Sequence, residues 1–216
     1  VLTELSLKVL PKSHATGTVL IEGLADAQAV RALSRALASP YEVTGAAHLQ
    51  RGADGTPVTM VRIEGFENSV AYRAGELKKI LSAFGEVKIE TDPERTFAAW
   101  RSVRDVEAFH GRDADIWRLS VKPSDAPVIV SRLHGAEAVY DWGGGLVWLL
   151  VPQSSNATEI RAAVAKTGGH ATLIRGNRAA GVFQPLAPAV AALHDGLRAR
   201  FDPRGILNPG LMGRAA

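Results

Sequence analysis

The order of the predicted elements constrains this fold most, because the same order occurs twice. From residue 18, the pattern predicts a strand, a helix, two strands, a helix and a strand, and the series starts again at residue 115. In the strands, apolar and polar residues alternate, whereas in the helices apolar residues recur three or four positions apart. A β-α-β-β-α-β series is the ferredoxin-like pattern of split βαβ units.

The first unit is predicted over residues 17–91. Asp26 and Asn68 are expected to cap its two helices, because their side-chain oxygens can accept hydrogen bonds from free amides of the first turn. Ser39-Pro40 stops the first helix and Gly85 stops the second. We expect the strands of this unit at residues 18–23, 41–49, 58–63 and 87–90.

The second unit is predicted over residues 114–175. Gly143-Gly144-Gly145 separates two of its strands and is expected to form a hairpin turn, with Trp142 and Trp148 packed in the core or at an interface. Asn156 to Glu159 is a capping box at the start of the second helix. We expect the strands at residues 115–121, 138–142, 146–151 and 171–174.

Two such units can share one antiparallel sheet with helices on one face, so the predicted class is α+β. The linker at residues 92–112 contains its own helix, which starts at Pro93 with Asp92 as the N-cap. A further helix is expected at residues 188–200, followed by a tail rich in turn formers.

Charge and composition argue against several classes of protein. The net charge of +3 comes mostly from arginines that are spread along the chain, so no nucleic-acid partner is expected. The chain has no cysteine, and its six histidines lack the spacing of metal ligands, so no metal site is predicted. The apolar stretch at residues 145–151 is too short to cross a bilayer, and we expect no transmembrane segment. The chain opens without methionine or a basic first segment, so we expect no signal peptide and expect the chain to be part of a longer protein.

The tail is the most specific string in the sequence. Phe201-Asp202-Pro203, followed by the six residues 205–210, resembles the C-terminal signature of FAD-linked oxidases of the vanillyl-alcohol oxidase type. Residues 2–11 resemble the strand that ends the flavin-binding domain in that family. The intervening chain is similar to the E subunits of bacterial glycolate oxidases at residues 43–49, 117–120, 140–145 and 168–172, and at Trp100 with Arg104-Asp105.

This resemblance implies a domain organisation. Residues 1–12 would form a strand that belongs with an N-terminal FAD-binding domain of the same protein. Residues 13–186 would form the cap, or substrate, domain of the FAD-linked oxidase C-terminal type. Residues 187–216 would form a helix and a tail that return to the FAD-binding domain.

The resemblance also implies a function. The complete protein would bind FAD and work with a second flavoprotein subunit and an iron–sulfur subunit to oxidise glycolate, a small 2-hydroxy acid, to glyoxylate. Its location would be cytoplasmic, or peripheral at the inner membrane through partner subunits. This fragment should hold no FAD and should be inactive alone, because hydride transfer needs the flavin held against the substrate.

Several residues are candidates for the site. Asn208, Pro209 and Gly210 would lie near the flavin ring, although an ordinary turn is the alternative. Arg104 would contact the substrate carboxylate as a bidentate donor, with a solvated arginine as the alternative. Arg175 and Arg178 could contact an anion or could simply be solvated.

One departure from the relatives bears on the chemistry. Relatives that dehydrogenate 2-hydroxy acids carry metal-binding histidines after a glycine-rich turn and a Glu-His pair after a later Gly-Gly. At the first place this chain has residues 143–148, which contain no histidine. At the second it has residues 168–175, which lack the Glu-His pair. The metal-assisted reaction is therefore not expected of this cap.

A second class of function stays open at this point. Tandem ferredoxin-like units also serve as ligand-sensing or subunit-binding modules without chemistry, and fold alone does not separate the two. The tail motif favours the oxidase.

Overall fold

One eight-stranded sheet forms the centre of the molecule, with the strand order β4-β1-β3-β2-β6-β7-β5-β8 and antiparallel pairing between neighbours. The structure is a computed structural model that describes residues 2–9, 11, 13–153, 155 and 157–208. The strands are β1 (Ala15–Glu22), β2 (Gly45–Leu49), β3 (Val58–Gly65), β4 (Val87–Glu90), β5 (Asp115–Ser120), β6 (Glu137–Asp141), β7 (Leu146–Val151) and β8 (His170–Arg175).

Each half of the sheet is one ferredoxin-like unit. The first unit has the order β4-β1-β3-β2, and the second has the reverse order, β6-β7-β5-β8. The halves meet where β2 pairs with β6, through the register His48 to Tyr140 and Leu49 to Val139. The second strand of each unit therefore lies at the junction, and the predicted α+β class with two repeats is confirmed.

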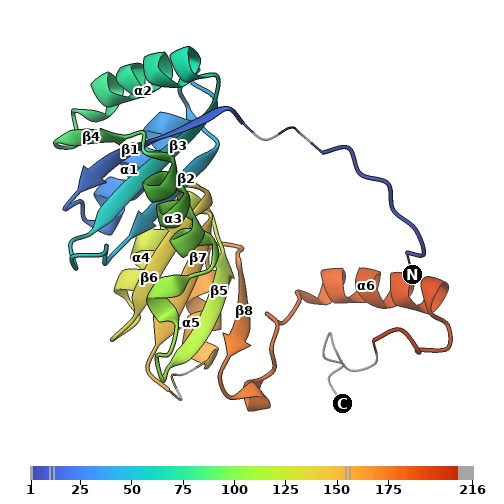
Figure 1. Ribbon diagram of the computed structural model, residues 1–216. Helices are drawn as coiled ribbons and strands as arrows, with labels where there is room; N and C mark the ends of the chain where they lie inside the picture. Colours follow the sequence, from blue (N-terminus) through green and yellow to red (C-terminus); the bar gives the residue numbers. More distant parts are fainter. Residues whose placement is uncertain (1, 10, 12, 154, 156, 209–216) are drawn as a thin grey trace.

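The helices of the two units cover one face of the sheet (Figure 1). Side chains that alternate along β1 and β3, such as Val19 and Ile63, pack against the first two helices, and those of β5 and β7 pack against the next two. These helices are α1 (Asp26–Leu37), α2 (Glu67–Leu81), α4 (Ala126–Ser131) and α5 (Ala157–Ala165).

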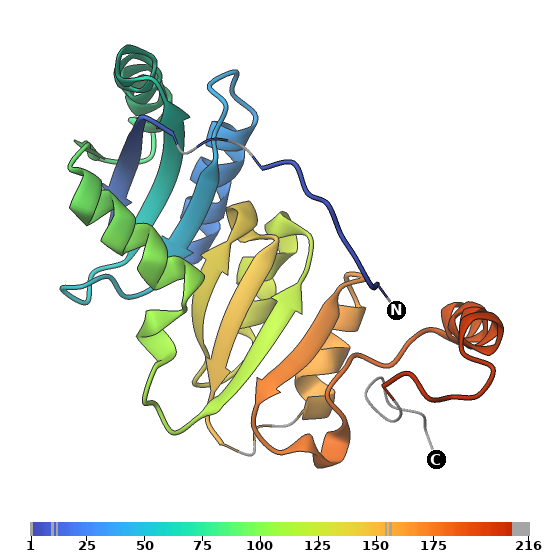
Figure 2. The ribbon, with the colours of Figure 1, turned by 45° about the vertical axis from the view of Figure 1, so that its right-hand side comes forward.

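The linker helix α3 (Pro93–Arg104) lies on the opposite face, as the turned view in Figure 2 shows. There Trp100, Val103 and Phe109 pack against Met60 and Leu150, from strands of different units. This second core spans the junction, so α3 helps to hold the two units together.

A buried polar network also joins the two units, and it corrects the predicted cap of α1. The N-cap of α1 is Ala25, without a side-chain hydrogen bond, because the Asp26 carboxylate points elsewhere. It accepts hydrogen bonds from Gln50 Nε2 at 2.6 Å and from Tyr140 Oη at 2.7 Å, and it lies 3.3 Å from His48 Nε2. Burial acts to raise the pKa of Asp26, but these contacts outweigh it and the pKa is lowered.

The cap of α2 differs from the expectation as well. This helix starts at Glu67, one residue before Asn68, and its N-cap is Phe66 without a side-chain hydrogen bond. The capping box predicted at Asn156 lies partly outside the described residues, because Asn156 itself is not described.

The terminal segments extend away from the sheet on the same side (Figures 1 and 2). The described residues 2–9 and 11 pair with no strand of the sheet. The strand predicted for residues 1–12, which would pair within a separate FAD-binding domain, stays a prediction. At the other end, α6 (Pro188–Phe201) has no buried residue among those described.

No helix in the described part of the chain has the length and apolar character needed to cross a membrane.

Candidate functional site

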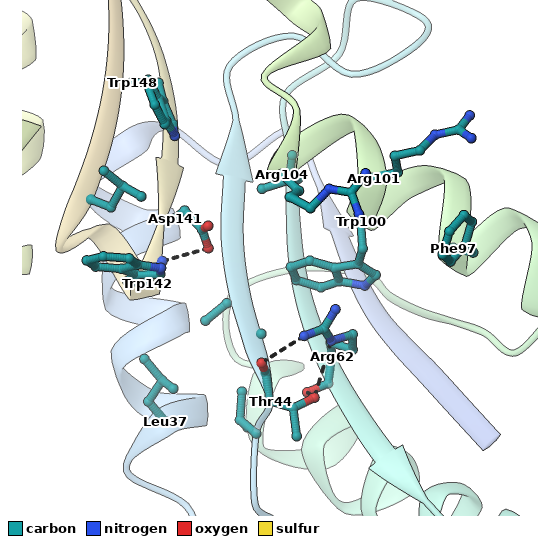
Figure 3. Close-up of a pocket in the computed structure, with 15 residues that line it drawn as sticks. Leu37, Thr44, Arg62, Phe97, Trp100, Arg101, Arg104, Asp141, Trp142 and Trp148 are labelled. Carbon is teal, nitrogen blue, oxygen red and sulfur yellow. Dashed lines mark hydrogen bonds between the residues drawn. The ribbon is translucent and has the colours of Figure 1, made fainter. Parts of the chain in front are cut away.

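A cavity of about 470 Å³ lies at the junction of the two units, on the face that α3 covers (Figure 3). Its walls come from α3, from β2 and β3 of the first unit, and from β6 and β7 of the second. Three of the four tryptophans of the chain line it. The lining includes Trp100, Trp142, Trp148, Arg62, Arg101, Arg104 and Asp141.

Trp100 forms the wall on the side of α3. The helix starts as predicted, because the Asp92 side chain accepts a hydrogen bond of 2.8 Å from the Arg95 amide. Trp100 Nε1 donates a buried hydrogen bond of 2.9 Å to Thr18 Oγ1. Beneath the ring, a Cβ atom at Gly45 would lie 3.0 Å from two of its carbons. The ring therefore rests on the backbone of β2, where only glycine leaves enough room.

Arg62 lies against the same ring. Its Cζ is 5.0 Å from the centroid of Trp100, a cation–π distance. The guanidinium donates to the Thr44 carbonyl at 3.1 Å and approaches the Glu64 carboxylate at 3.4 Å. With the stacking and these two contacts, the charge has a fixed position on the cavity wall.

Trp142 lies across the cavity in a backbone conformation that is rare for a bulky residue. Its φ is +52°, and Gly143 and Gly144 follow with φ of +67° and +102°. A Cβ atom at Gly143 would lie 2.5 Å from Leu37 Cδ1, because this turn packs on the end of α1. The indole is 59% exposed, so Trp142 does not pack in the core and the interface alternative remains. Arg118 stacks on it, with Cζ 5.5 Å from the ring centroid.

Asp141 is a partly buried carboxylate in the cavity wall. Burial raises its pKa, while the hydrogen bond from the Trp142 amide and the charge of Arg62 act in the opposite direction. The hydrogen bond from Trp142 N to Asp141 Oδ1 is 2.7 Å long. The same contact therefore fixes the carboxylate and supports the strained turn.

Arg104, the candidate for substrate binding, does line the cavity. Its guanidinium is held by the adjacent Asp105 through two bonds, of 2.7 Å from Nε and 2.9 Å from Nη2. This ion pair lowers the pKa of Asp105 and raises that of Arg104. Arg104 thus reaches the cavity with a carboxylate partner already in place.

Among the other sequence candidates, Arg175, Arg178 and Asn208 do not line the cavity. Arg175 donates to the backbone carbonyls of Ala114 and Arg112, and Arg178 starts a short 3-10 helix after β8. Asn208 lies beyond α6 with a φ of +47°. Pro209 and Gly210 are outside the described residues. The candidates that the structure describes are therefore not brought together in one place.

Sequence reasoning did not select Arg62 or Asp141. Arg62 interrupts the apolar strand at residues 58–63, and its alternation with Val61 and Ile63 was a signal that it faces away from their core. Asp141 adjoins the glycine-rich turn, and no local signal distinguished its carboxylate as part of a site. Among the described residues, no group of three or more histidine, aspartate or glutamate side chains could hold a metal ion.

Comparison with known proteins gives one similar curated sequence. No family model matches the chain. The chain is 31% identical over 213 residues to glycolate oxidase subunit GlcE of Escherichia coli (strain K12), across 98% of this chain and 53% of that protein. The predicted resemblance to the E subunits of glycolate oxidases is thereby confirmed. The chain spans about half the length of the curated relative that it matches.

Solved structures share the fold at low identity. A crystal structure of p-cresol methylhydroxylase with substrate bound matches with a TM-score of 0.60 and 15% identity, over 94% of this chain and 54% of that one. A structure of alkyldihydroxyacetonephosphate synthase matches with a TM-score of 0.51 and 14% identity, over 92% and 45% of the two chains. These matches concern the architecture alone.

Proposed function

We propose that this chain is the cap region of an FAD-linked oxidoreductase subunit, and that the complete protein takes part in oxidising glycolate to glyoxylate. The observation that carries the proposal is the similarity to glycolate oxidase subunit GlcE across almost the whole chain. The cap architecture is compatible with it, and so is a cavity of a size ordinary for small-molecule sites.

The apolar terminal segments support a further domain beside this cap. In the N-terminal segment, Leu7 and Val9 are 74% and 80% exposed, and in α6, Leu193 and Phe201 are 70% and 80% exposed. Large apolar side chains that are exposed along such segments are typical of surfaces that another domain covers. We infer that an FAD-binding domain covers both segments, as the predicted roles of residues 1–12 and 187–216 require.

The described part of the tail has features that suit a contact with a flavin ring. The Asp202 carboxylate accepts hydrogen bonds from the amides of Ile206 at 2.9 Å and Leu207 at 2.8 Å, and these bonds lower its pKa. They fix the turn that leads into Asn208, whose amide can donate and accept at the edge of a heterocycle. Asn208, Pro209 and Gly210 remain our candidates for this contact.

The cavity residues would bind the substrate and keep water away from it. When bound, FAD would supply the hydride acceptor. Arg104 keeps its proposed role as a carboxylate contact, for which Asp105 must release at least one of its bonds. The tryptophans would line the space between the arginines and Asp141 with apolar surface. This chain alone should be inactive, because the domain that would hold FAD is separate from it.

For the partners and the location we propose what the resemblance in the sequence implies. We propose a second flavoprotein subunit and an iron–sulfur subunit that pass electrons to an acceptor. We also propose a cytoplasmic location, or a peripheral one at the inner membrane through those subunits.

The test is to express the full-length protein and this chain separately and to record the visible absorbance of flavin in each. We expect FAD in the full-length protein, glycolate-dependent reduction of an artificial acceptor once the partner subunits are added, and neither property in this chain. A colourless full-length protein that takes up no FAD would refute the proposal and favour a ligand-sensing or subunit-binding module.

A further inference from the structure

Arg118 places a charge on a part of the sheet that no helix of the described chain covers. Burial alternates along β5, so Trp117 and Leu119 face the core beneath α4 and α5 while Arg118 lies on the opposite face. On that face, Figure 2 shows α3 beside the first unit and the junction, with β5 and β8 left open. Arg118 is half-buried there. A charge that is partly removed from water normally has a partner.

The indole of Trp142 fixes the orientation of the guanidinium. The Cζ atom of Arg118 lies 5.5 Å from the centroid of that ring, within cation–π distance. Because β7 lies between β6 and β5, Trp142 reaches from the end of β6 across one strand to make this contact. A guanidinium that stacks through its face keeps the N–H groups along its edge free to donate. The stack therefore orients the donors without using them.

The backbone at Trp142 is strained to hold the indole in this position. Its φ of +52° is rare for a bulky residue. The turn is fixed against α1, since a Cβ atom at Gly144 would lie 3.1 Å from Val30 Cγ2. Burial of the indole does not explain the strain, because the residue is 59% exposed. Strain of this kind is typical of functional sites.

Arg118 also differs from the two other arginines in the strands. Arg62 pairs with the Glu64 carboxylate, and Arg175 donates to the Ala114 carbonyl. Within the described ranges, the guanidinium of Arg118 makes the stacking contact but no hydrogen bond and no ion pair. Its donors are therefore available to a ligand.

Two hydroxyl groups stand beside these donors. Thr172 lies directly opposite Arg118 on β8, and the Cβ atoms of such cross-strand neighbours are about 4.5–5.5 Å apart. Ser120 lies on the same face, two residues further along β5. Neither hydroxyl takes part in a hydrogen bond among the residues that the structure describes. A guanidinium edge with hydroxyl donors next to it is suited to an oxyanion.

We propose that Arg118, oriented by Trp142 and flanked by Thr172 and Ser120, binds the carboxylate of a small organic acid on the open face of the second unit. One carboxylate neutralises the one charge of Arg118, and its two oxygens match the planar fork of the guanidinium. The site goes beyond the proposed function, which places the substrate carboxylate at Arg104, and Arg118 does not line the cavity that Arg104 reaches.

NMR titration of this 216-residue chain tests the proposal, because the indole N–H signal of Trp142 reports on the stack. The probes are acetate, glycolate, inorganic phosphate, acetamide and sodium chloride, all at equal ionic strength. We expect saturable shifts with acetate and glycolate, and their dissociation constants should agree within about threefold because the site contacts the carboxylate alone. Phosphate should bind more weakly, and acetamide and chloride should cause no saturable shift.

Variants assign the binding to individual side chains. Arg118→Gln should weaken acetate at least about tenfold, and Thr172→Val, which keeps the shape of the side chain, about threefold. Trp142→Asn tolerates the left-handed backbone and should weaken acetate about threefold, as followed by the amide signal of Thr172. Arg104→Gln should leave the Trp142 response unchanged. Arg132→Gln is the matched control, since Arg132 is exposed at the end of α4.

Three results would overturn the proposal. The first is the lack of a saturable shift with acetate, which would leave Arg118 as a solvated arginine. The second is a shift that Arg104→Gln removes and Arg118→Gln does not, which would assign the binding to the cavity. The third is tighter binding of phosphate than of acetate. The titration uses no FAD, so its outcome is independent of the flavin absorbance that tests the proposed function.

Discussion

At Gly45, the absence of a Cβ atom decides whether Trp100 can lie over β2. An added Cβ would stand 3.0 Å from the Trp100 ring and 3.1 Å from Arg62 Cβ, closer than ordinary van der Waals contact. Gly45→Ala should lower the free energy of unfolding by about 1–3 kcal/mol, the usual cost of overpacking. Urea denaturation measures the change.

The control for Gly45 is Gly75 in α2, where an added Cβ would meet no atom within 4 Å. Gly75→Ala should stabilise the protein by roughly 0.5–1 kcal/mol, because alanine favours a helix over glycine. If both variants behaved alike, Trp100 would not rest on β2 as described.

Asp141 should lower stability at neutral pH. Burial raises the pKa of its folded-state carboxyl above the ordinary value of 3.8. The protonated form therefore favours folding below pH 3.8, and this advantage is lost as the pH rises through the folded-state pKa. Asp141→Asn removes the charge of this partly buried side chain and should raise the free energy of unfolding at neutral pH, with the gain disappearing in acid.

Urea denaturation across a pH series measures the effect of Asp141→Asn. Asp195→Asn, on the exposed surface of α6, is the control and should change little. A variant that is less stable than the original protein at neutral pH would show that Asp141 contributes through a favourable contact rather than opposing folding.

At the scale of elements, the junction of the two units depends on few backbone contacts. β2 and β6 share only two residue pairs, so the Asp26 network across them carries part of the connection. Tyr140 is fully buried and donates to Asp26 Oδ2 at 2.7 Å. Tyr140→Phe leaves the partly buried Asp26 carboxylate one donor short and should cost about 1–3 kcal/mol.

Hydrogen exchange identifies where the Tyr140→Phe variant loosens. The amides of β2 and β6 should exchange faster, and those of β1 and β5 should change less, because the network lies at the junction. Tyr72→Phe is the control, since Tyr72 is 64% exposed on α2. Uniform acceleration across the whole sheet would mean that the junction does not open separately.

At the scale of the whole molecule, α6 adds little to the stability of the cap. None of its described residues is buried. Removal of residues 187–216 should shift the thermal midpoint by less than about 2 °C, which corresponds to under 1 kcal/mol in a chain of this size. It should also reduce the binding of a hydrophobic dye, because exposed apolar side chains are lost.

A longer deletion provides the contrast. Removing residues 176–216 also takes away Val182, whose carbonyl accepts a hydrogen bond of 2.8 Å from the Leu173 amide, and Gly181, whose carbonyl accepts one of 2.7 Å from Arg161. This variant should unfold at a clearly lower temperature. If the shorter deletion were equally damaging, the boundary predicted at residue 186 would be wrong.

The elements, the α+β class and the resemblance to the E subunits of glycolate oxidases could be predicted from the sequence alone. The alternation of apolar and polar residues in β3 and the helical spacing of apolar residues in α1 are local signals. They indicate which side chains face a core. Local signals also located Asp92 correctly as the N-cap of α3, because that cap needs only the helix's own backbone.

Long-range packing determines which partners the polar side chains find. Asp26 does not cap α1, because its carboxylate instead contacts His48 of β2, Gln50 just after β2 and Tyr140 of β6. The cavity brings Arg62 of β3 and Asp141 of β6 to one space, since β2 pairs with β6 and α3 crosses the opposite face. The periodicity of apolar residues along the chain does not encode which edge strands of the two units pair. Only the tertiary fold therefore brings these residues to one site.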